Sequence, residues 1–96
     1  MRAVNLRRAG LTIAISLLPL CGMAQGLAPT FELSIVRPGG DYNSFDAGPN
    51  PKACQLKCIS DPQCHAWSYE KPTCWLKNRV PLPAISPHMV SGVVRR

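Results

Sequence analysis

Cys54, Cys58, Cys64 and Cys74 lie close together in the sequence, and His65 directly follows the third of them. Thiolates and an imidazole can bind zinc, but this spacing fits poorly with the paired C-x2–4-C knuckles of structural zinc sites. The stretch also lacks a C-x-x-C redox motif and the C-x-x-C-H sequence that attaches haem. In an exported chain, four such cysteines are typical of two disulfides. We therefore expect disulfides here, with no metal ion and no cofactor.

A second group of residues could bind a ligand rather than react with one. Trp75 offers a plane for stacking, Lys77 and Arg79 offer positive charge and hydrogen-bond donors, and His65 lies at the start of the same predicted hairpin. The alternatives are a core position for Trp75, solvated charges for Lys77 and Arg79, and a half-buried imidazole for His65. Trp67 and Tyr69 alternate on the first hairpin strand; they could join Trp75 in an aromatic platform for a sugar, or fill the core with their polar tips reaching partners at its edge.

Catalytic residues are not evident in this sequence. Asp41, Asp46, Asp61 and Glu70 include no closely spaced pair of carboxylates, and there is no G-x-S-x-G motif. Because the four cysteines are expected in disulfides, no thiol is left as a nucleophile. We therefore expect a protein that is not an enzyme.

The N-terminal residues 1–24 have the order of a signal peptide. Arginines precede an apolar run from Leu11 to Leu20, and Gly22 and Ala24 are small residues at the positions that signal peptidase reads. We expect cleavage before Gln25 and export to the periplasm or the medium. The apolar run is about half of the ~20 residues that a membrane-spanning helix needs. We therefore expect no membrane span in the mature chain; a lipoprotein signal at Cys21 or a twin-arginine signal is a weaker alternative.

Charge argues against a nucleic-acid partner. The formal net charge of +6 includes three arginines of the predicted signal peptide, so the mature chain is only mildly basic. Its lysines and arginines are scattered along the sequence rather than clustered. The composition leaves a protein or an acidic glycan as a possible partner.

The remaining residues indicate a short helix followed by a hairpin. Asn50 and Pro51 are typical of a helix start, and Asp61-Pro62 of a turn after a helix that ends near Ser60. Before the helix we expect a flexible tail over 25–30, an extended first strand over 31–36, a turn over 37–40 and a short extended piece over 41–45. After the helix we expect hairpin strands over 64–69 and 74–77 and an irregular Pro-rich connection over 80–87. A last strand over 88–94 and a C-terminal tail over 95–96 should complete the domain.

Several ordered blocks together resemble the PAN/apple superfamily, in the compact four-cysteine form of bacterial exported proteins. The resemblance covers residues 31–94 and implies an α+β domain with an antiparallel sheet wrapped around one short helix. It also implies a core position for Trp67 and binding of a protein or a carbohydrate. The outer cysteine pair of larger apple domains is absent, so their ligand-binding residues do not transfer to this chain. The matching blocks are Gly39–Tyr42 with Phe45, Ala53–Cys58, Asp61–Cys64, Ala66–Tyr69, Cys74–Lys77, Val80–Pro83 and Ser91–Val93.

Four cysteines allow three pairings, and the sequence favours one of them. Residues four apart on a helix hold their Cβ atoms ~5 to 6 Å apart, beyond the ~3.5 to 4.5 Å of a disulfide, which excludes Cys54 with Cys58. The turn at 61–62 brings Cys64 nearest Cys58, and the hairpin returns Cys74 toward Cys54. The expected bonds are therefore Cys58 with Cys64 and Cys54 with Cys74, as the resemblance also implies.

Together these features predict an exported, non-catalytic module that binds a protein or a carbohydrate. The alternative is a small structural or assembly component of the cell envelope that associates with a larger protein. The sequence names neither the ligand nor the oligomeric state.

Overall fold

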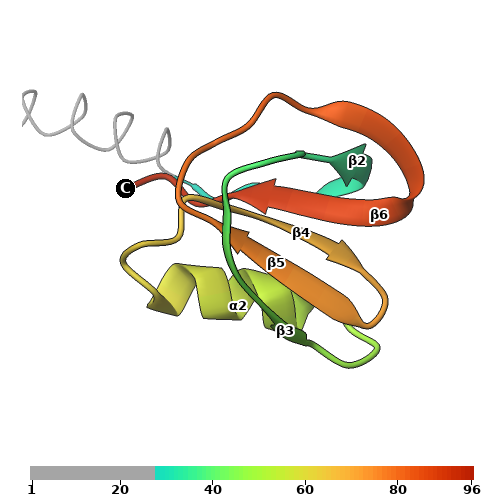
Figure 1. Ribbon diagram of the computed structural model, residues 1–96, viewed down its shortest axis with the longest axis horizontal. Coiled ribbons are helices and arrows are strands. Elements are labelled where there is room, and N and C mark those ends of the chain that lie inside the picture. Colours follow the sequence, from blue (N-terminus) through green and yellow to red (C-terminus); the bar gives the residue numbers. More distant parts are fainter. Residues whose placement is uncertain (1–27) are drawn as a thin grey trace, which may run out of the picture.

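The computed structural model describes residues 28–96 and contains a five-stranded antiparallel sheet and one helix (Figure 1). The predicted signal peptide and residues 25–27 of the predicted tail lie outside the described residues. The α+β architecture predicted from the sequence is confirmed. The elements are β2 (Glu32–Val36), β3 (Asp41–Asp46), α2 (Lys52–Ser60), β4 (Ala66–Glu70), β5 (Thr73–Lys77) and β6 (Ala84–Val93), with strand order β2-β6-β4-β5-β3.

Helix α2 starts and ends where its flanking residues predict. The side chain of Asn50 accepts a hydrogen bond from the backbone N–H of Lys52 at 2.9 Å, and Pro51 already has a helical φ of −63°. Asp61 is extended, as expected for a residue before proline, and ends the helix. Within described residues 28–96, no helix is long and apolar enough to cross a membrane.

Two disulfides hold α2 on the sheet. The buried residues of the helix are Cys54 and Cys58, while Leu56 and Ile59 are exposed. A nine-residue helix is marginal by itself in water, and this one has no broad apolar face to anchor it. Cys54 is joined to Cys74 on β5, and Cys58 to Cys64 just before β4. The covalent bonds therefore replace much of the packing that would otherwise position α2.

The core lies between α2 and the sheet. Trp67 is fully buried, as predicted, and Tyr69 is nearly so, with its hydroxyl donating to the Gly48 carbonyl at 2.7 Å. The Trp67 indole N–H has no hydrogen-bond partner among residues 28–96, contrary to the expectation for its polar tip. The core also includes the four cysteines, Leu76 and Val94, with Tyr42, Phe45, Ala47 and Val90 packed against it.

Hydrogen bonds attach residues near both ends of the domain to its strands and to the end of α2. The Thr30 hydroxyl accepts from the Val93 N–H at 2.8 Å, and the Thr30 N–H donates to the Val93 carbonyl. The Arg96 guanidinium donates to the carbonyls of Cys58, Asp61 and Cys64 at 2.6 to 2.8 Å. At the Cys58 carbonyl, in the last turn of α2, this cation satisfies a helix-end acceptor and interacts favourably with the negative end of the helix dipole. Thr30 and the Arg96 side chain are therefore hydrogen-bonded to the domain, although both lie outside its helices and strands.

Strand β6 starts earlier than the proline content predicts. The predicted irregular connection over 80–87 ends at Pro83, because residues from Ala84 onward pair with β2. The register jumps from Leu33↔Val90 to Ile35↔Ile85, so Ser34, with φ of 59°, faces a bulge that contains Pro87. A proline in a bulge removes no ladder hydrogen bond. Pro87 is therefore tolerated inside the strand.

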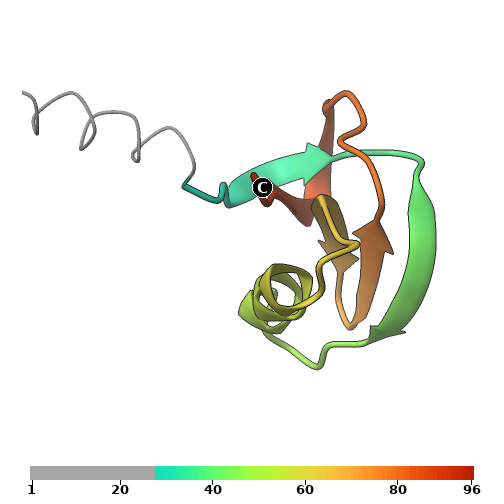
Figure 2. The same cartoon turned by 90° about the vertical axis from the view of Figure 1, so that its left-hand side faces the viewer.

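Strands β2 and β3 are consecutive in the sequence but form opposite edges of the sheet. Their connection, residues 37–40, must therefore pass across one face of the sheet. Figure 2 shows α2 on one side of β4 and β5, and the chain that leads into β3 on the other side. We call residues 37–40 the crossing segment. The crossing segment therefore covers part of the sheet on the face opposite α2.

Candidate functional site

The face opposite α2 carries alternate residues of the central strands. Cys74 and Leu76 are in the core against the helix, so Trp75 and Lys77 project from the other face of β5. Ser68 of β4 lies opposite Trp75 in the register and opposite Ser91 of β6. These residues therefore share the side over which the crossing segment passes.

A hollow of about 260 Å³ opens between the crossing segment and this face. Its wall combines apolar surface from four residues with a few polar groups. The lining residues are Val36, Pro38, Gly39, Asp41, Ser68, Trp75, Lys77 and Met89. An aromatic plane beside a mainly apolar wall is the kind of concavity that binds ligands.

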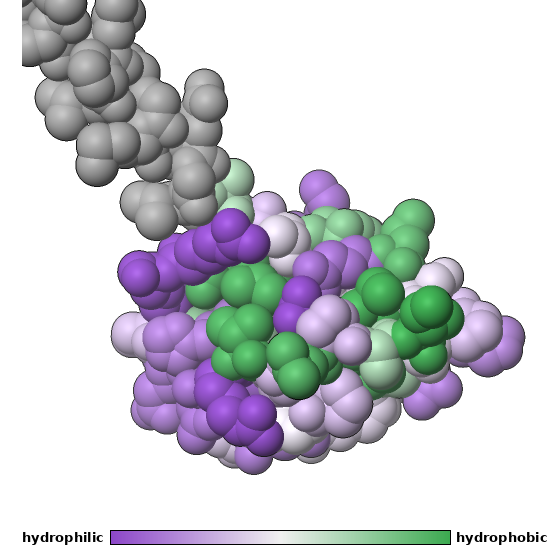
Figure 3. Space-filling view, turned by 90° about the horizontal axis from the view of Figure 1, so that it is seen from above, coloured by the Kyte–Doolittle hydropathy of each residue, from purple (hydrophilic) through white to green (hydrophobic). Residues whose placement is uncertain are grey.

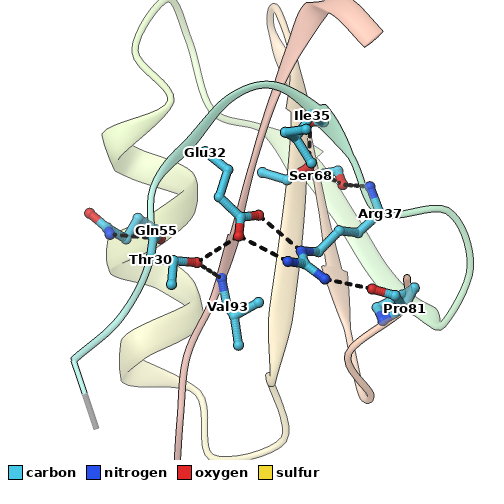
Figure 4. Close-up of polar contacts among 9 residues, drawn as sticks. Thr30, Glu32, Ile35, Arg37, Gln55, Ser68, Pro81 and Val93 are labelled. Atoms are coloured by element: carbon cyan, nitrogen blue, oxygen red, sulfur yellow. Dashed lines mark hydrogen bonds and ion pairs between the residues drawn. The ribbon is translucent and has the colours of Figure 1, made fainter. Parts of the chain in front are cut away.

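Arg37 fastens the first end of the crossing segment (Figure 4). Its guanidinium donates to both carboxylate oxygens of Glu32 at 2.9 Å and to the Pro81 carbonyl at 2.7 Å. Its backbone N–H donates to the Ser68 hydroxyl at 3.2 Å. The hydrogen bonds from Arg37 lower the pKa of Glu32, which keeps this carboxylate charged.

Two buried hydroxyls link the crossing segment to β2 through the middle of the sheet. The Ser91 hydroxyl donates to the Ile35 carbonyl at 2.8 Å and lies 2.8 Å from the Ser68 hydroxyl. Since Ser91 uses its hydrogen on Ile35, Ser68 must donate to Ser91 while accepting from Arg37. The donor direction is therefore fixed from Arg37 through Ser68 and Ser91 to Ile35, and both hydroxyl hydrogens are used.

Lys77 fastens the second end of the crossing segment. The Lys77 side chain is only 3% exposed, and its ammonium pairs with Asp41 and donates to the Gly39 carbonyl at 3.2 Å. Gly39 and Gly40 have φ of 98° and 76°, a backbone conformation that suits glycine. A Cβ at Gly39 would lie 2.6 Å from a terminal nitrogen of Arg79, so the Arg79 side chain packs directly on this turn.

The structure brings together three of the four predicted ligand-binding residues. Trp75 and Lys77 line the hollow, and Arg79 packs against Gly39 at its border. His65 is not among the lining residues; its backbone N–H donates to the Lys77 carbonyl, and its carbonyl accepts from the Val94 N–H. The Lys77 ammonium is committed to internal partners, so it positions the crossing segment instead of offering a free charge.

Sequence reasoning missed six lining residues: Val36, Pro38, Gly39, Asp41, Ser68 and Met89. They come from β2, the crossing segment, β3, β4 and β6, so only the strand order brings them together. The Pro-Gly-Gly turn did signal a tight change of direction at 38–40. It carried no information about the face over which the chain turns.

A separate polar pair lies at the other side of the domain. The Tyr42 hydroxyl donates to Asp61 at 2.6 Å. Burial, followed by this hydrogen bond, raises the pKa of Tyr42 to about 12, and the same bond lowers the pKa of Asp61. Neither residue lines the hollow. The pair connects β3 to the turn after α2.

A comparison with known protein families bears on this region of the chain. Residues 35–77 match the PAN domain family. Over these residues the chain is similar to PAN domains. The PAN match spans the crossing segment, α2, both disulfides and the β4–β5 hairpin, and so includes all lining residues of the hollow except Met89. PAN domains are generally protein- or carbohydrate-binding modules and are typically non-catalytic. No curated protein matches the chain.

Proposed function

We propose that this PAN domain is an exported, non-catalytic module that binds a protein or a carbohydrate at the hollow under the crossing segment. The observation that carries the proposal is a concave wall with a partly exposed indole, Trp75, beneath a segment fastened at both ends. Proteins bind ligands preferentially in such preformed concavities.

The fastening supports binding in a physical way. Arg37 holds one end of the crossing segment to Glu32 and Pro81, and Lys77 holds the other end to Asp41 and Gly39. A site that is already ordered loses little conformational entropy when the ligand arrives. Less of the binding free energy is then offset by the cost of ordering the crossing segment.

Export is part of the same proposal. Disulfides form and persist in oxidising compartments such as the periplasm or the medium, and the two bonds hold α2 in place. The order of basic, apolar and small residues in 1–24 gives the same location. Intact mass of the protein from the envelope or the medium should show a chain that begins at Gln25. A chain that still begins at Met1, or that carries lipid on Cys21, would contradict export with signal-peptide cleavage before Gln25.

One observation favours a second candidate, a structural or assembly component bound to a larger envelope protein. Leu33, Leu82 and Ile85 are 70%, 86% and 84% exposed. Figure 3 shows hydrophobic residues gathered on the surface seen from above, where the β2 and β6 side of the domain faces the viewer. Exposed apolar surface of this kind is typical of contacts with another protein.

A paired screen separates the two candidates. The exported protein is tested on a glycan array and, immobilised, in a pull-down from envelope extract, alongside a Trp75→Ala variant and a Leu82→Ala variant. A ligand lost with Trp75→Ala and kept with Leu82→Ala supports binding at the hollow. Stable co-purification of one large protein that is lost only with Leu82→Ala supports the assembly role. Finding no ligand in either screen would contradict the binding function.

A further inference from the structure

The polar groups that line the hollow are already paired with the protein itself. Lys77 is bound to Asp41 and Gly39, and the Ser68 hydroxyl is bound to Arg37 and Ser91. Only the Asp41 side chain, which is 46% exposed, keeps substantial contact with solvent among the charged groups of the lining. The surface available to a ligand is therefore mainly that of apolar side chains: Val36, Pro38, Trp75 and Met89.

This wall suits an apolar group better than a sugar. A sugar ring carries several hydroxyls, and each one that enters the hollow without a partner weakens binding, because its hydrogen bonds to water are lost. Apolar carbon loses nothing of this kind and gains contact with the indole of Trp75. A cavity of about 150 Å³ is enough to hold a benzene molecule. The hollow, at about 260 Å³, can therefore hold one aromatic or large aliphatic side chain.

The border of the hollow carries one unbalanced charge. Among residues 28–96 the ion pairs are Arg37 with Glu32 and Lys77 with Asp41, so these four charges cancel. Arg79 is exposed, packs on Gly39 and Gly40, and belongs to neither pair. A ligand group placed in the hollow would therefore have a guanidinium nearby, which favours a carboxylate next to the apolar group.

We propose that the hollow receives an aromatic or large aliphatic side chain from an acidic segment of a partner protein, with a neighbouring carboxylate on Arg79. This inference rests on the proposed binding function and selects a protein over a carbohydrate as the ligand. The partner is defined by its chemistry: one apolar side chain that enters the hollow, flanked by Asp or Glu.

The chain supplies its own reporter for this test. It has two tryptophans, of which Trp67 is fully buried in the core and Trp75 lines the hollow. Their indole N–H signals in an NMR spectrum of the ¹⁵N-labelled protein, assigned with Trp75→Phe, distinguish the hollow from the core. The probes are the blocked peptides acetyl-Glu-Phe-Glu-amide, acetyl-Lys-Phe-Lys-amide and acetyl-Glu-Ala-Glu-amide, with methyl glucoside and methyl galactoside as sugar probes.

The proposal expects acetyl-Glu-Phe-Glu-amide to shift the Trp75 indole saturably and to leave the Trp67 indole in place. The Lys-Phe-Lys peptide should bind about three- to fivefold more weakly, the effect of one solvent-exposed ion pair, and the Ala peptide should not saturate. Arg79→Gln should reduce the difference between the two Phe peptides, while Lys52→Gln, at an exposed lysine on α2, should not change it. Met89→Glu should abolish binding, and Leu56→Glu on the exposed side of α2 should leave it intact; amide dispersion shows that each variant folds.

The outcomes also separate this inference from the proposed function. If a methyl glycoside shifts the Trp75 indole and the Phe peptides do not, the module binds carbohydrate and the inference is wrong. If none of the probes moves the Trp75 indole, or if both Phe peptides bind equally well, the inference is also wrong. In each of these cases a ligand found in the paired screen would still support a binding module. Failure of the screen itself would overturn the function instead.

Discussion

Gly92 allows the indole of Trp67 to pack directly against β6. The two residues are opposite each other in the register, and a Cβ at Gly92 would lie 2.5 Å from the indole nitrogen and 2.5 Å from the Thr30 carbonyl oxygen. Real Cβ atoms do not approach other atoms so closely, so an alanine must displace either the core indole or the backbone next to β2. Gly92 is therefore a packing requirement of the core.

We expect Gly92→Ala to lower the free energy of unfolding by about 3 kcal/mol, the upper range for inserting a methyl group into a packed core. Gly48→Ala is the matched control, because Gly48 has a φ of 69° but no atom within 4 Å of its Cβ position. That control should lose only the backbone contribution of about 1 to 2 kcal/mol. Chemical denaturation measures both; a Gly92→Ala variant as stable as Gly48→Ala would contradict this packing.

Glu32 and Arg37 should make the stability of the domain depend on acid. In the folded protein, the hydrogen bonds from Arg37 lower the pKa of Glu32 below its ordinary value of 4.5. The pair's contribution to the free energy of unfolding is therefore fully present above the pKa of Glu32 in the unfolded chain. It is lost as the pH falls through the lower pKa of Glu32 in the folded protein.

Glu32→Gln should accordingly lower stability by about 1 kcal/mol at pH 7, and this loss should shrink as the pH falls below 4.5. Denaturation at a series of pH values measures this difference, with Glu70→Gln at an exposed position as the control. Equal destabilisation by Glu32→Gln at pH 7 and at pH 2 would show that the charge is not what the pair contributes.

Sequence reasoning identified single residues where chemistry and local pattern agree. The four cysteines and the buried Trp67 are examples: alternation along the strand placed Trp67 on one face, and the PAN/apple resemblance implied that this face is in the core. The burial of Lys77 could not be predicted from the sequence, because its partner Asp41 lies 36 residues away in the chain. A lysine is normally solvated, and only the strand order reveals a carboxylate beside it.

At the scale of elements, the two disulfides should contribute differently to the stability of the domain. Cys54 and Cys74 are separated by 20 positions, and Cys58 and Cys64 by 6. In the loop-entropy model the longer loop constrains the unfolded chain by about 3 kcal/mol and the shorter one by about 2 kcal/mol. The longer bond also joins α2 to β5, whereas the shorter one spans only the turn after the helix.

Replacing Cys54 and Cys74 together by alanine should therefore destabilise the domain more than replacing Cys58 and Cys64 together. Thermal or chemical unfolding of both double variants gives the comparison, and non-reducing peptide mapping of the unaltered protein gives the pairing. A domain that loses more stability without the shorter bond, or a peptide that joins Cys54 to Cys64, would contradict this assignment.

Element boundaries were predictable where a residue has a strong local preference. Asn50, Pro51 and Pro62 mark the ends of α2, and their preferences act within a few residues. The start of β6 was not predictable, because Pro87 argues against a strand unless a bulge accommodates it. That bulge depends on Ser34, which belongs to a distant part of the sequence.

At the scale of the whole molecule, the decisive feature is the strand order. Since β2 and β3 are opposite edges, residues 37–40 must cross the sheet, and the hollow forms beneath them. Local patterns predicted the strands and the turn but contain no information about which strands are neighbours. The PAN resemblance implied the fold class, and the structure shows the hollow that we propose as the site.

The central claim is that the hollow is the binding surface of this domain, and site-specific photo-cross-linking tests it most directly. A photoreactive amino acid replaces either Arg79, at the border of the hollow, or Lys52, on the helix that covers the opposite face. Both positions are exposed, so both variants should fold. The account predicts that, in living cells or envelope extract, the probe at 79 captures a discrete protein and the probe at 52 does not. Capture of the same protein from position 52, with none from position 79, would contradict it.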